Sequence, residues 1–298
     1  MPTAIRIIHT TRYRYKRAVS FGNHRLLLRP RDGHDLRLMH SAISITPTAQ
    51  IRWHFDTFGN SVATAIFLEP SNQLEIRSEL LVRRFSRDDF LISIDRRRVG
   101  YPFQYSSDVL TDLSHFIALE NVDEAVELAR WLDTVFKKKP DEVLAFLQHL
   151  SETIYANLTY VRREQVGTQT ALTTIRLKSG SCRDFAFLFM ECARWFGFAA
   201  RFVTGYLNDQ SENENTLQGG GATHAWAEIY LPEEGWIEFD PTNQILASSA
   251  LIRVAVTRTP LQATPILGSY NDQTGGSFIG MDVEVDVKSE QYDPDQDP

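Results

Sequence analysis

The sequence predicts an α+β protein in which a small antiparallel β-sandwich precedes a core of helices packed on an antiparallel sheet. Three observations indicate this class. Apolar and polar residues alternate in short runs over about the first 90 residues, as at Ile5 and Ile7, with turn signals between the runs. Apolar positions then recur at helical spacing from about residue 105 to 157. Strand patterns return after residue 198, and one of them continues through a short turn into a second strand.

The N-terminal strands carry no group of residues typical of catalysis. Further alternating pairs there are Tyr13 and Tyr15, Ile43 and Ile45, and Leu74 and Ile76. The histidines of this part lack metal-ligand spacing and are expected to be structural: His9, His24, His34, His40 and His54. Two helices are expected next, over residues 122–136 and 141–156, because Asn121 and Pro140 are start signals.

The chain of 298 residues is long enough for one large or two medium domains. Its formal net charge is -7, but the first hundred residues are net positive by about eight charges and the remainder is net negative by about fifteen. The densest basic run, Arg96 to Arg98, is typical of a solvated face or a contact between domains. Because the overall balance is acidic and no nucleic-acid motif is present, we expect no nucleic-acid partner.

The expected compartment is the cytoplasm. The sequence shows no signal peptide, no apolar run of membrane-spanning length and no disulfide framework. We therefore expect no membrane association.

Residues 180–186 (GSCRDFA) predict a helix that begins at or next to Cys182. Ser181 and Asp184 have the spacing of a capping box, and Gly197 is a stop signal. Apolar residues between them recur at steps of three and four: Phe185, Phe189, Cys192 and Phe196. A thiol at a helix N-terminus faces unpaired backbone N–H groups and the positive end of the dipole, which stabilise a thiolate. The same N–H groups could bind the oxyanion of a tetrahedral intermediate.

The two cysteines differ in their sequence context. Cys182 could be a small buried apolar residue instead of a nucleophile. Cys192 lies in the middle of the apolar stripe, where packing is the expected role. Two cysteines ten positions apart lack the short spacing of a zinc site, so no metal is expected.

A predicted hairpin brings a histidine and an aspartate to one face. Residues 223–230 read as a strand, 231–235 as a turn and 236–240 as the returning strand. If Tyr230 pairs with Glu234, His224 faces Asp240 with Cβ atoms about 5 Å apart. A shift by one residue would separate them onto opposite faces. Taken singly, His224 could be a structural strand histidine, and Asp240 could start an Asp-Pro turn.

Four segments in order resemble the transglutaminase-like superfamily of papain-type thiol enzymes. They are residues 180–186 (GSCRDFA), 200–206 (ARFVTGY), 224–228 (HAWAE) and 236–242 (WIEFDPT). The resemblance implies a papain-like, transglutaminase-like core. It also implies a catalytic triad in which Cys182 is the nucleophile, His224 the general base and acid, and Asp240 the orienting carboxylate.

The N-terminal part is similar to the N-terminal region of the bacterial branch of that superfamily. The matching segments are residues 6–15 (RIIHTTRYRY), 26–31 (LLLRPR) and 56–60 (DTFGN). Residues 253–260 (RVAVTRTP) differ from the Gly-Arg-Asp-Tyr motif found in many relatives. The departure indicates a subgroup and leaves the substrate open.

These observations predict three parts of the chain. Residues 1–95 form the β-rich N-terminal domain, 96–287 the catalytic domain, and 288–298 an acidic, disordered tail. Strands near 251–257 and 278–287 are expected to close the catalytic sheet. The polar segment 208–222, just before His224, is either a lid over the site or a flexible connector.

The expected function is attack by Cys182 on an amide carbonyl, followed by hydrolysis as in a cysteine protease or amidase. Transglutaminase-type transfer to an amine is the alternative, and a non-catalytic binding protein on the same fold is the third reading. Tyr160, Trp226 and Gln169 are further candidates for oxyanion or wall contacts. The expected partner is a peptide, protein or small amide substrate. No cofactor is expected, no calcium-binding loop is recognised, and a homo-oligomer is left open.

Overall fold

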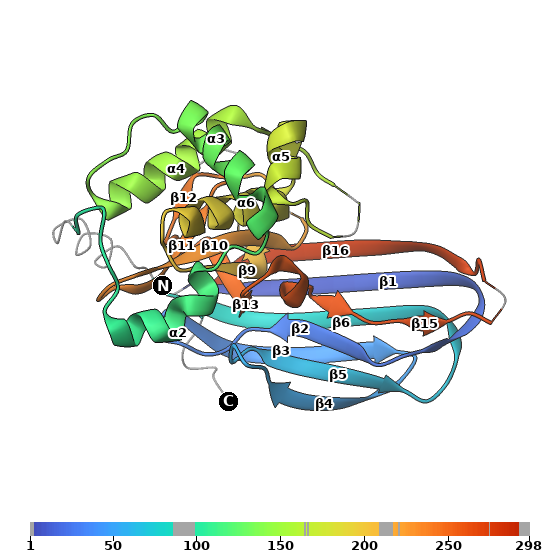
Figure 1. The fold of residues 1–298 in the computed structure, drawn as a ribbon. Helices are drawn as coiled ribbons and strands as arrows, with labels where there is room; N and C mark the ends of the chain where they lie inside the picture. The colour runs from blue at the N-terminus through green and yellow to red at the C-terminus, as the bar shows by residue number, and fades with distance from the viewer. Residues whose placement is uncertain are drawn as a thin grey trace.

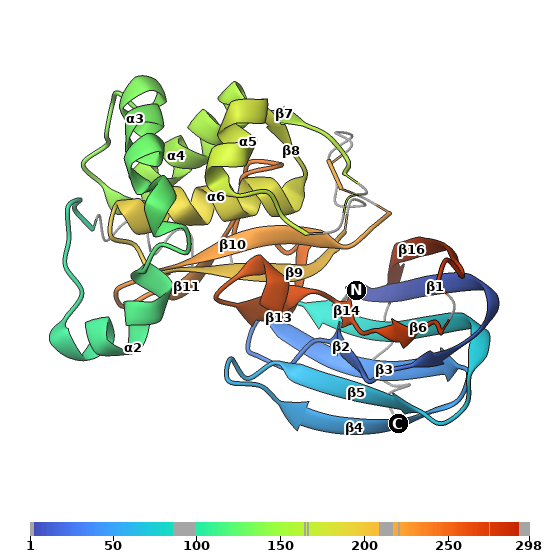
Figure 2. The same ribbon diagram turned by 45° about the vertical axis from the view of Figure 1, so that its right-hand side comes forward.

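The expected N-terminal sandwich and the helix-on-sheet core are both present. The structure, a computed structural model, describes residues 3–85, 99–163, 165, 167–208, 217–219, 221–273 and 275–291. The basic run from Arg96 to Arg98 and most of the segment 208–222 lie outside the described residues. Figures 1 and 2 show most of the helices on one side of a central sheet and the sandwich on its other side.

The sandwich is formed by six strands from the N-terminal part and three from the C-terminal end of the chain. The N-terminal strands are β1 (Thr3–Phe21), β2 (His24–Arg29), β3 (Leu36–Thr46), β4 (Ala49–Phe55), β5 (Ser61–Phe67) and β6 (Ser71–Arg84). The C-terminal strands are β14 (Ile266–Leu267), β15 (Tyr270–Asn271) and β16 (Phe278–Gln291). One sheet has the order β15-β1-β6-β3, with β16 also paired to β1, and the other has the order β14-β2-β5-β4. Between the sheets lie the alternating residues predicted from sequence, including Tyr15, Leu74 and Ile76.

The last strand corrects the expected domain limits. Residues 278–287 were predicted to close the catalytic sheet, but β16 pairs antiparallel with β1, from Thr3 opposite Gln291 to Tyr15 opposite Phe278. Residues 288–291 are therefore strand and not part of a disordered tail, while 292–298 lie outside the described residues. The reason is that β1 has two edges, of which β6 occupies one and β16 the other.

The central sheet of the catalytic part has the strand order β12-β11-β10-β9-β13. Its strands are β9 (Ala200–Leu207), β10 (His224–Leu231), β11 (Gly235–Asp240), β12 (Ile245–Leu246) and β13 (Leu251–Thr257). The helices are α2 (Ser107–Ile117), α3 (Ala125–Val135), α4 (Val143–Asn157), α5 (Ala171–Leu177) and α6 (Cys182–Trp195), with short 3-10 turns η1 (Val122–Glu124) and η2 (Pro260–Ala263). Two short strands, β7 (Thr159–Tyr160) and β8 (Ser179–Gly180), pair in parallel, and β8 leads into α6.

Helix α6 is the centre of the catalytic core. It packs on β9 and β10 (Figure 1), where the alternating residues Ala225, Ala227 and Ile229 form a smooth apolar surface. Phe185 and Phe189 on the helix are fully buried against this surface, as their spacing predicts. Gly197 ends the helix with φ +88, a conformation that favours glycine.

The other face of the central sheet is covered by the N-terminal domain. The long strands β1 and β6 contact two different partners with the same face, one at each end of the strands. Near one end it packs on the sandwich core, and near the other it packs on the central sheet. The apolar cluster between these strands and the central sheet contains residues of both parts of the chain: Ile5, Ile7, Leu36, Leu80, Val82, Tyr206, Ile252, Val254 and Val285.

Two neutral polar contacts also join the parts. In the first, His9 Nδ1 lies 2.9 Å from the hydroxyl of Tyr206 in β9. The other ring nitrogen, Nε2, lies 3.0 Å from Thr11 Oγ1 within β1. Burial lowers the pKa of His9 to about 4, so the imidazole is neutral at pH 7 and serves as a structural bridge. Asn60, in the expected DTFGN motif, forms hydrogen bonds of 2.7 and 2.9 Å with the backbone carbonyl and N–H of Val256 in β13.

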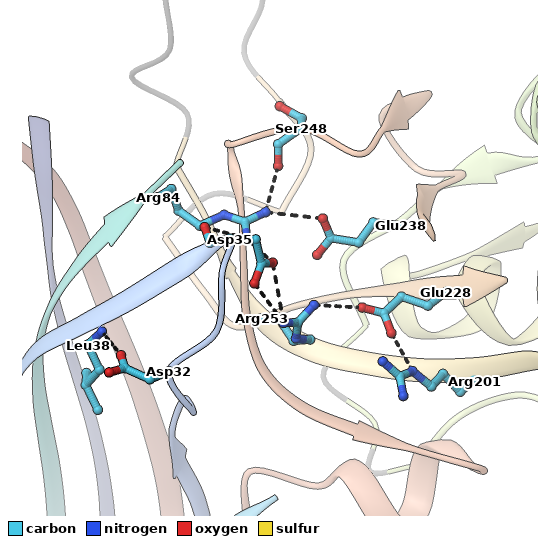
Figure 3. Close-up of polar contacts among 9 residues, drawn as sticks. All are labelled: Asp32, Asp35, Leu38, Arg84, Arg201, Glu228, Glu238, Ser248 and Arg253. Carbon is cyan, nitrogen blue, oxygen red and sulfur yellow. Dashed lines mark hydrogen bonds and ion pairs between the residues drawn. The ribbon is translucent and has the colours of Figure 1, made fainter. Parts of the chain in front are cut away.

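A buried cluster of charges joins the two parts more strongly (Figure 3). Arg84, at the end of β6, binds Asp35 at 2.7 Å and Glu238 of β11 at 3.2 Å, and also donates to the carbonyl of Ser248. Arg253 of β13 binds Asp35 and Glu228, and Arg201 of β9 binds the other oxygen of Glu228.

The cluster balances three arginines against three carboxylates. Its most buried members, Arg84, Asp35, Glu228 and Glu238, have side chains at most 3% exposed. Burial opposes ionisation of Glu228, but Arg201 and Arg253 outweigh it and lower its pKa. For Glu238, burial prevails over Arg84 and raises the pKa. A buried ion pair is costly to break because the remaining charge has no solvent to stabilise it.

Replacing Arg84 by alanine should therefore reduce the free energy of unfolding by about 3–5 kcal/mol, because Asp35 and Glu238 lose their shared cation. Urea unfolding at pH 8, followed by tryptophan fluorescence, measures the loss. The matched control is Arg12→Ala, which removes exposed ion pairs with Glu75 of β6 and Glu284 of β16. We expect a much smaller loss for the control. Equal losses for both variants would contradict the role given to Arg84.

Candidate active site

The predicted nucleophile lies at the first residue of α6. Ser181 is the extended residue before the helix, and its side-chain and backbone groups both donate to Asp184 Oδ2 at 2.8 Å. Cys182 follows with 7% of its surface exposed. The first backbone N–H groups of a helix have no partner within it, so they face the space beside the thiol. The helix start predicted from Ser181 and Asp184 is confirmed.

Asp184 organises the chain around the thiol. Its carboxylate is fully buried and accepts hydrogen bonds from Arg163 Nε at 2.7 Å and from the backbone N–H of Gln169 at 2.7 Å, besides those of Ser181. Three segments of the chain therefore meet at one side chain. The carboxylate is paired with Arg163, so its charge is compensated next to the thiol.

The hairpin places His224 and Asp240 on one face but with a register different from the one expected. Tyr230 pairs with Trp236, not with Glu234, and Leu231 pairs with Gly235. The reason is that Leu231 stays in the strand, where its side chain is buried in the core beside α6, so the turn closes one residue later. The parity of the turn is unchanged.

His224 therefore reaches Asp240 diagonally and not from directly opposite, as diagonal neighbours on one face can do. His224 Nε2 lies 2.7 Å from Asp240 Oδ2, and both side chains are fully buried. The hydrogen bond orients the imidazole with Nδ1 as its remaining nitrogen. The indole of Trp226 stacks beside it, with ring centroids 6.0 Å apart.

The charged forms of His224 and Asp240 stabilise each other. Burial alone would lower the pKa of His224, but the charge of Asp240 and the hydrogen bond to it prevail, and Cys182 adds to the effect, so the pKa rises from 6.5 to about 10. Burial would raise the pKa of Asp240, but His224 and the donors Asn243 and Thr242 lower it. The site thus favours an imidazolium beside a carboxylate.

Cys182 lies near enough to His224 to influence its pKa, while Nδ1 has no hydrogen-bond partner among the described residues. Nδ1 is thus available to exchange a proton with the thiol. Cys192 provides the contrast. It is fully buried, and burial raises the pKa of its thiol well above 9. The two cysteines therefore have the different surroundings that the sequence predicted.

The three residues expected to form oxyanion or wall contacts occupy different positions around the site. Tyr160 pairs with Gly180 through the parallel strands β7 and β8, so it stands beside the cysteine segment. Burial raises the pKa of Tyr160, and the charges of Cys182 and Asp240 add to this. Trp226 is fully buried, and its Nε1 has no partner among the described residues. The Gln169 side chain accepts a hydrogen bond from Thr174 of α5, so it stabilises the start of that helix.

Asn243 and Gly219 are site residues that the sequence did not single out. Asn243 Nδ2 lies 2.8 Å from Asp240 Oδ2, and Gly219 packs against the His224 ring. The only local signal for Asn243 is its place directly after Asp240-Pro241-Thr242, which reads as a turn. Gly219 belongs to a run of three glycines, which indicates a loop but not its position.

The described residues contain neither a candidate metal site nor a candidate membrane-spanning helix. No group of three or more His, Cys, Asp or Glu side chains in this part of the chain could hold a metal ion. None of the described helices is long and apolar enough to cross a membrane.

Comparisons with known proteins identify the two parts. Residues 129–241 match the family model of the transglutaminase-like superfamily, and residues 5–83 match that of the bacterial transglutaminase-like N-terminal region. The chain carries a transglutaminase-like domain. The family match spans all three predicted site residues and confirms the resemblance described above.

Similar proteins extend over nearly the whole chain. The crystal structure of a proposed cysteine protease from Cytophaga hutchinsonii has a TM-score of 0.70 and 18% identity, covering 99% of this chain and 93% of that one. At this identity it confirms the fold alone. An uncharacterized protein of Mycobacterium tuberculosis is 29% identical over 95% of this chain and 91% of its own length. A protein-glutamine gamma-glutamyltransferase of Pseudomonas aeruginosa is 34% identical over 70 residues, which cover 23% of this chain and 10% of that protein.

The His224–Asp240 pair should give stability a defined pH dependence. Because the pKa of His224 is raised from 6.5 to about 10 on folding, its contribution is complete below pH 6.5 and is lost as pH rises to about 10. The lowered pKa of Asp240 means that its contribution is present above pH 3.8 and is lost below it. His224→Gln should therefore reduce the free energy of unfolding by about 3–5 kcal/mol at pH 6, and by progressively less toward pH 10.

Urea unfolding of wild type and His224→Gln at intervals from pH 5.5 to 10 measures this difference. Asp240→Asn is the matched control, since it removes the other charge of the same pair and should show the same decline. A difference that stays constant over this range would show that the imidazolium does not contribute.

Proposed function

We infer that the protein is a Cys–His–Asp thiol enzyme that forms an acyl-enzyme on an amide substrate. The observation that carries this proposal is the buried His224–Asp240 hydrogen bond of 2.7 Å, with Nδ1 left unpaired near Cys182 at the start of α6. A nucleophile, a base and an orienting carboxylate are the three parts that thiol acyl transfer requires. The transglutaminase-like domain match supports the same reading.

The first half of the reaction transfers the acyl group to the enzyme. The raised pKa of His224 favours transfer of the Cys182 proton to Nδ1 before the substrate reacts. The resulting thiolate sulfur then forms a bond to the amide carbonyl carbon. The negative oxygen of the tetrahedral intermediate is stabilised by backbone N–H groups at the start of α6. His224 then gives the proton to the amide nitrogen, the C–N bond breaks, and a thioester and a free amine result.

The second half uses an acceptor. Water attacks the thioester carbon while His224 Nδ1 takes its proton, the C–S bond breaks, and the proton returns to the Cys182 sulfur. This gives hydrolysis, as in a cysteine protease or amidase, which is the proposed reaction. Asp240 stabilises the imidazolium in both halves and does not accept the proton itself.

Transfer to a primary amine is the second candidate, because an amine can replace water at the same thioester. The name of the Pseudomonas aeruginosa relative points the same way over the 70 residues that match. Both candidates share Cys182, His224 and Asp240.

The reactivity of Cys182 tests the proposal without a known substrate. Iodoacetamide at pH 7.5, with peptide mapping by mass spectrometry, should label Cys182 rapidly and leave Cys192 unlabelled in the native protein, because Cys192 is fully buried. His224→Ala should slow the labelling of Cys182 at least tenfold, because the proton acceptor is lost. Equal labelling in wild type and His224→Ala would favour a non-catalytic binding protein.

Substrate libraries then separate the two reactions. Peptide amides and glutamine-containing peptides are incubated with wild type in H₂¹⁸O, with and without a fluorescent primary amine. Hydrolysis predicts one ¹⁸O in the acid product, and transfer predicts an amine adduct. Cys182→Ala should abolish turnover, and Asp240→Asn should reduce it by about 10⁴-fold. Turnover by Cys182→Ala would contradict the assigned nucleophile.

A further inference from the structure

A single amide side chain joins the orienting carboxylate to the segment that covers the imidazole. Asn243 Nδ2 donates to Asp240 Oδ2 at 2.8 Å and to the Gln218 carbonyl at 3.1 Å. Asn243 Oδ1 accepts from the backbone N–H of Gln218 at 2.7 Å. The residue after Gln218 is Gly219, so the same amide determines where Gly219 lies.

Gly219 lies against the reacting side of His224. A Cβ atom at Gly219 would be 2.7 Å from His224 Nδ1, a distance that real Cβ atoms do not show, and its φ of +97 also favours glycine. Leu217, on the other side of Gln218, packs with the cluster that contains Trp226. Residues 217–219 therefore form a wall beside the nitrogen that exchanges the proton.

The hydrogen bonds to Asp240 fix its orientation. Oδ2 accepts from His224 Nε2 at 2.7 Å and from Asn243, and Oδ1 accepts from the Thr242 backbone N–H at 2.9 Å. Rotation of the carboxylate would break all of them. The Asn243 position requires donors for Asp240 and for the Gln218 carbonyl, and an acceptor for the Gln218 N–H. A neutral amide meets all three requirements, whereas a carboxylate can only accept.

We propose that Asn243 is a positioning residue that holds Asp240 and the wall at residues 217–219 in one arrangement around His224. The proposal rests on the proposed function, since it assigns a role in the same proton transfer. Its chemical consequence concerns the leaving group. The departing amine must take its proton from Nδ1 beside Gly219, so Asn243 shapes the space through which the amine leaves.

The variant Asn243→Asp tests this role through its pH dependence. A carboxyl at position 243 lies beside Asp240, and the like charge raises its pKa. In its protonated form it can donate to Asp240 and accept from the Gln218 N–H, which are two of the three hydrogen bonds that the amide forms. In its ionised form it repels Asp240 and cannot donate. The rate of Cys182 alkylation by iodoacetamide, divided by the wild-type rate, should be near one at pH 5 and at least tenfold lower at pH 8.

Asn243→Leu is the comparison variant, because leucine can form none of the three hydrogen bonds. Its relative rate should be at least tenfold low at both pH values. Asn157→Ala is the matched control, since that exposed asparagine donates only to a carbonyl within α4 and should alter neither rate. Near-UV circular dichroism at each pH confirms that each variant is folded. If Asn243→Leu does not fold, the ratio measured for Asn243→Asp at the two pH values decides.

The outcomes separate this inference from the proposed function. If wild-type Cys182 is no more reactive than in His224→Ala, the proposed function fails. If wild-type Cys182 is reactive and the relative rate of Asn243→Asp is the same at pH 5 and pH 8, Asn243 is a structural residue only and the inference fails. A relative rate that falls with pH in Asn243→Asp supports it.

Discussion

The arrangement of this protein depends on the burial of both faces of one sheet. Sheet β12-β11-β10-β9-β13 has an apolar face under α6, and its other face carries Glu228 and Glu238. Buried carboxylates require cations, and the N-terminal domain supplies Arg84 while β13 supplies Arg253. The sandwich is therefore part of the electrostatic environment of the catalytic strands (Figure 3) and not a separate module.

The same constraint also explains how the site residues are held in position. His224 and Asp240 lie on the strands that also carry Glu228 and Glu238, so the contacts that hold the carboxylates also fix the hairpin. On the opposite side, the apolar residues of β10 hold α6 and its first residue, Cys182. The thiol and the imidazole are thus positioned by two sides of one sheet. Asn243 adds the last link, from Asp240 to the segment beside Nδ1.

Local signals in the sequence predicted local structure well, and distant pairings less well. The start of α6 follows from Ser181 and Asp184, which act within one turn. The shared face of His224 and Asp240 follows from the parity of the turn, but the register depends on the burial of Leu231, which the turn sequence does not reveal. The pairing of β16 with β1 joins the two ends of the chain, and the role of Asn243 depends on Gln218, 25 residues away. The cytoplasmic location stays a prediction.

The central claim is that Cys182 is a nucleophile activated by His224, and the most direct measurement is the rate of Cys182 alkylation in wild type and His224→Ala across pH 5 to 9. The account predicts that wild-type Cys182 is alkylated at least tenfold faster than in His224→Ala at neutral pH, while Cys192 stays unlabelled in both native proteins. Identical rate–pH curves for Cys182 in the two proteins would contradict the account, because the imidazole would then have no influence on the thiol.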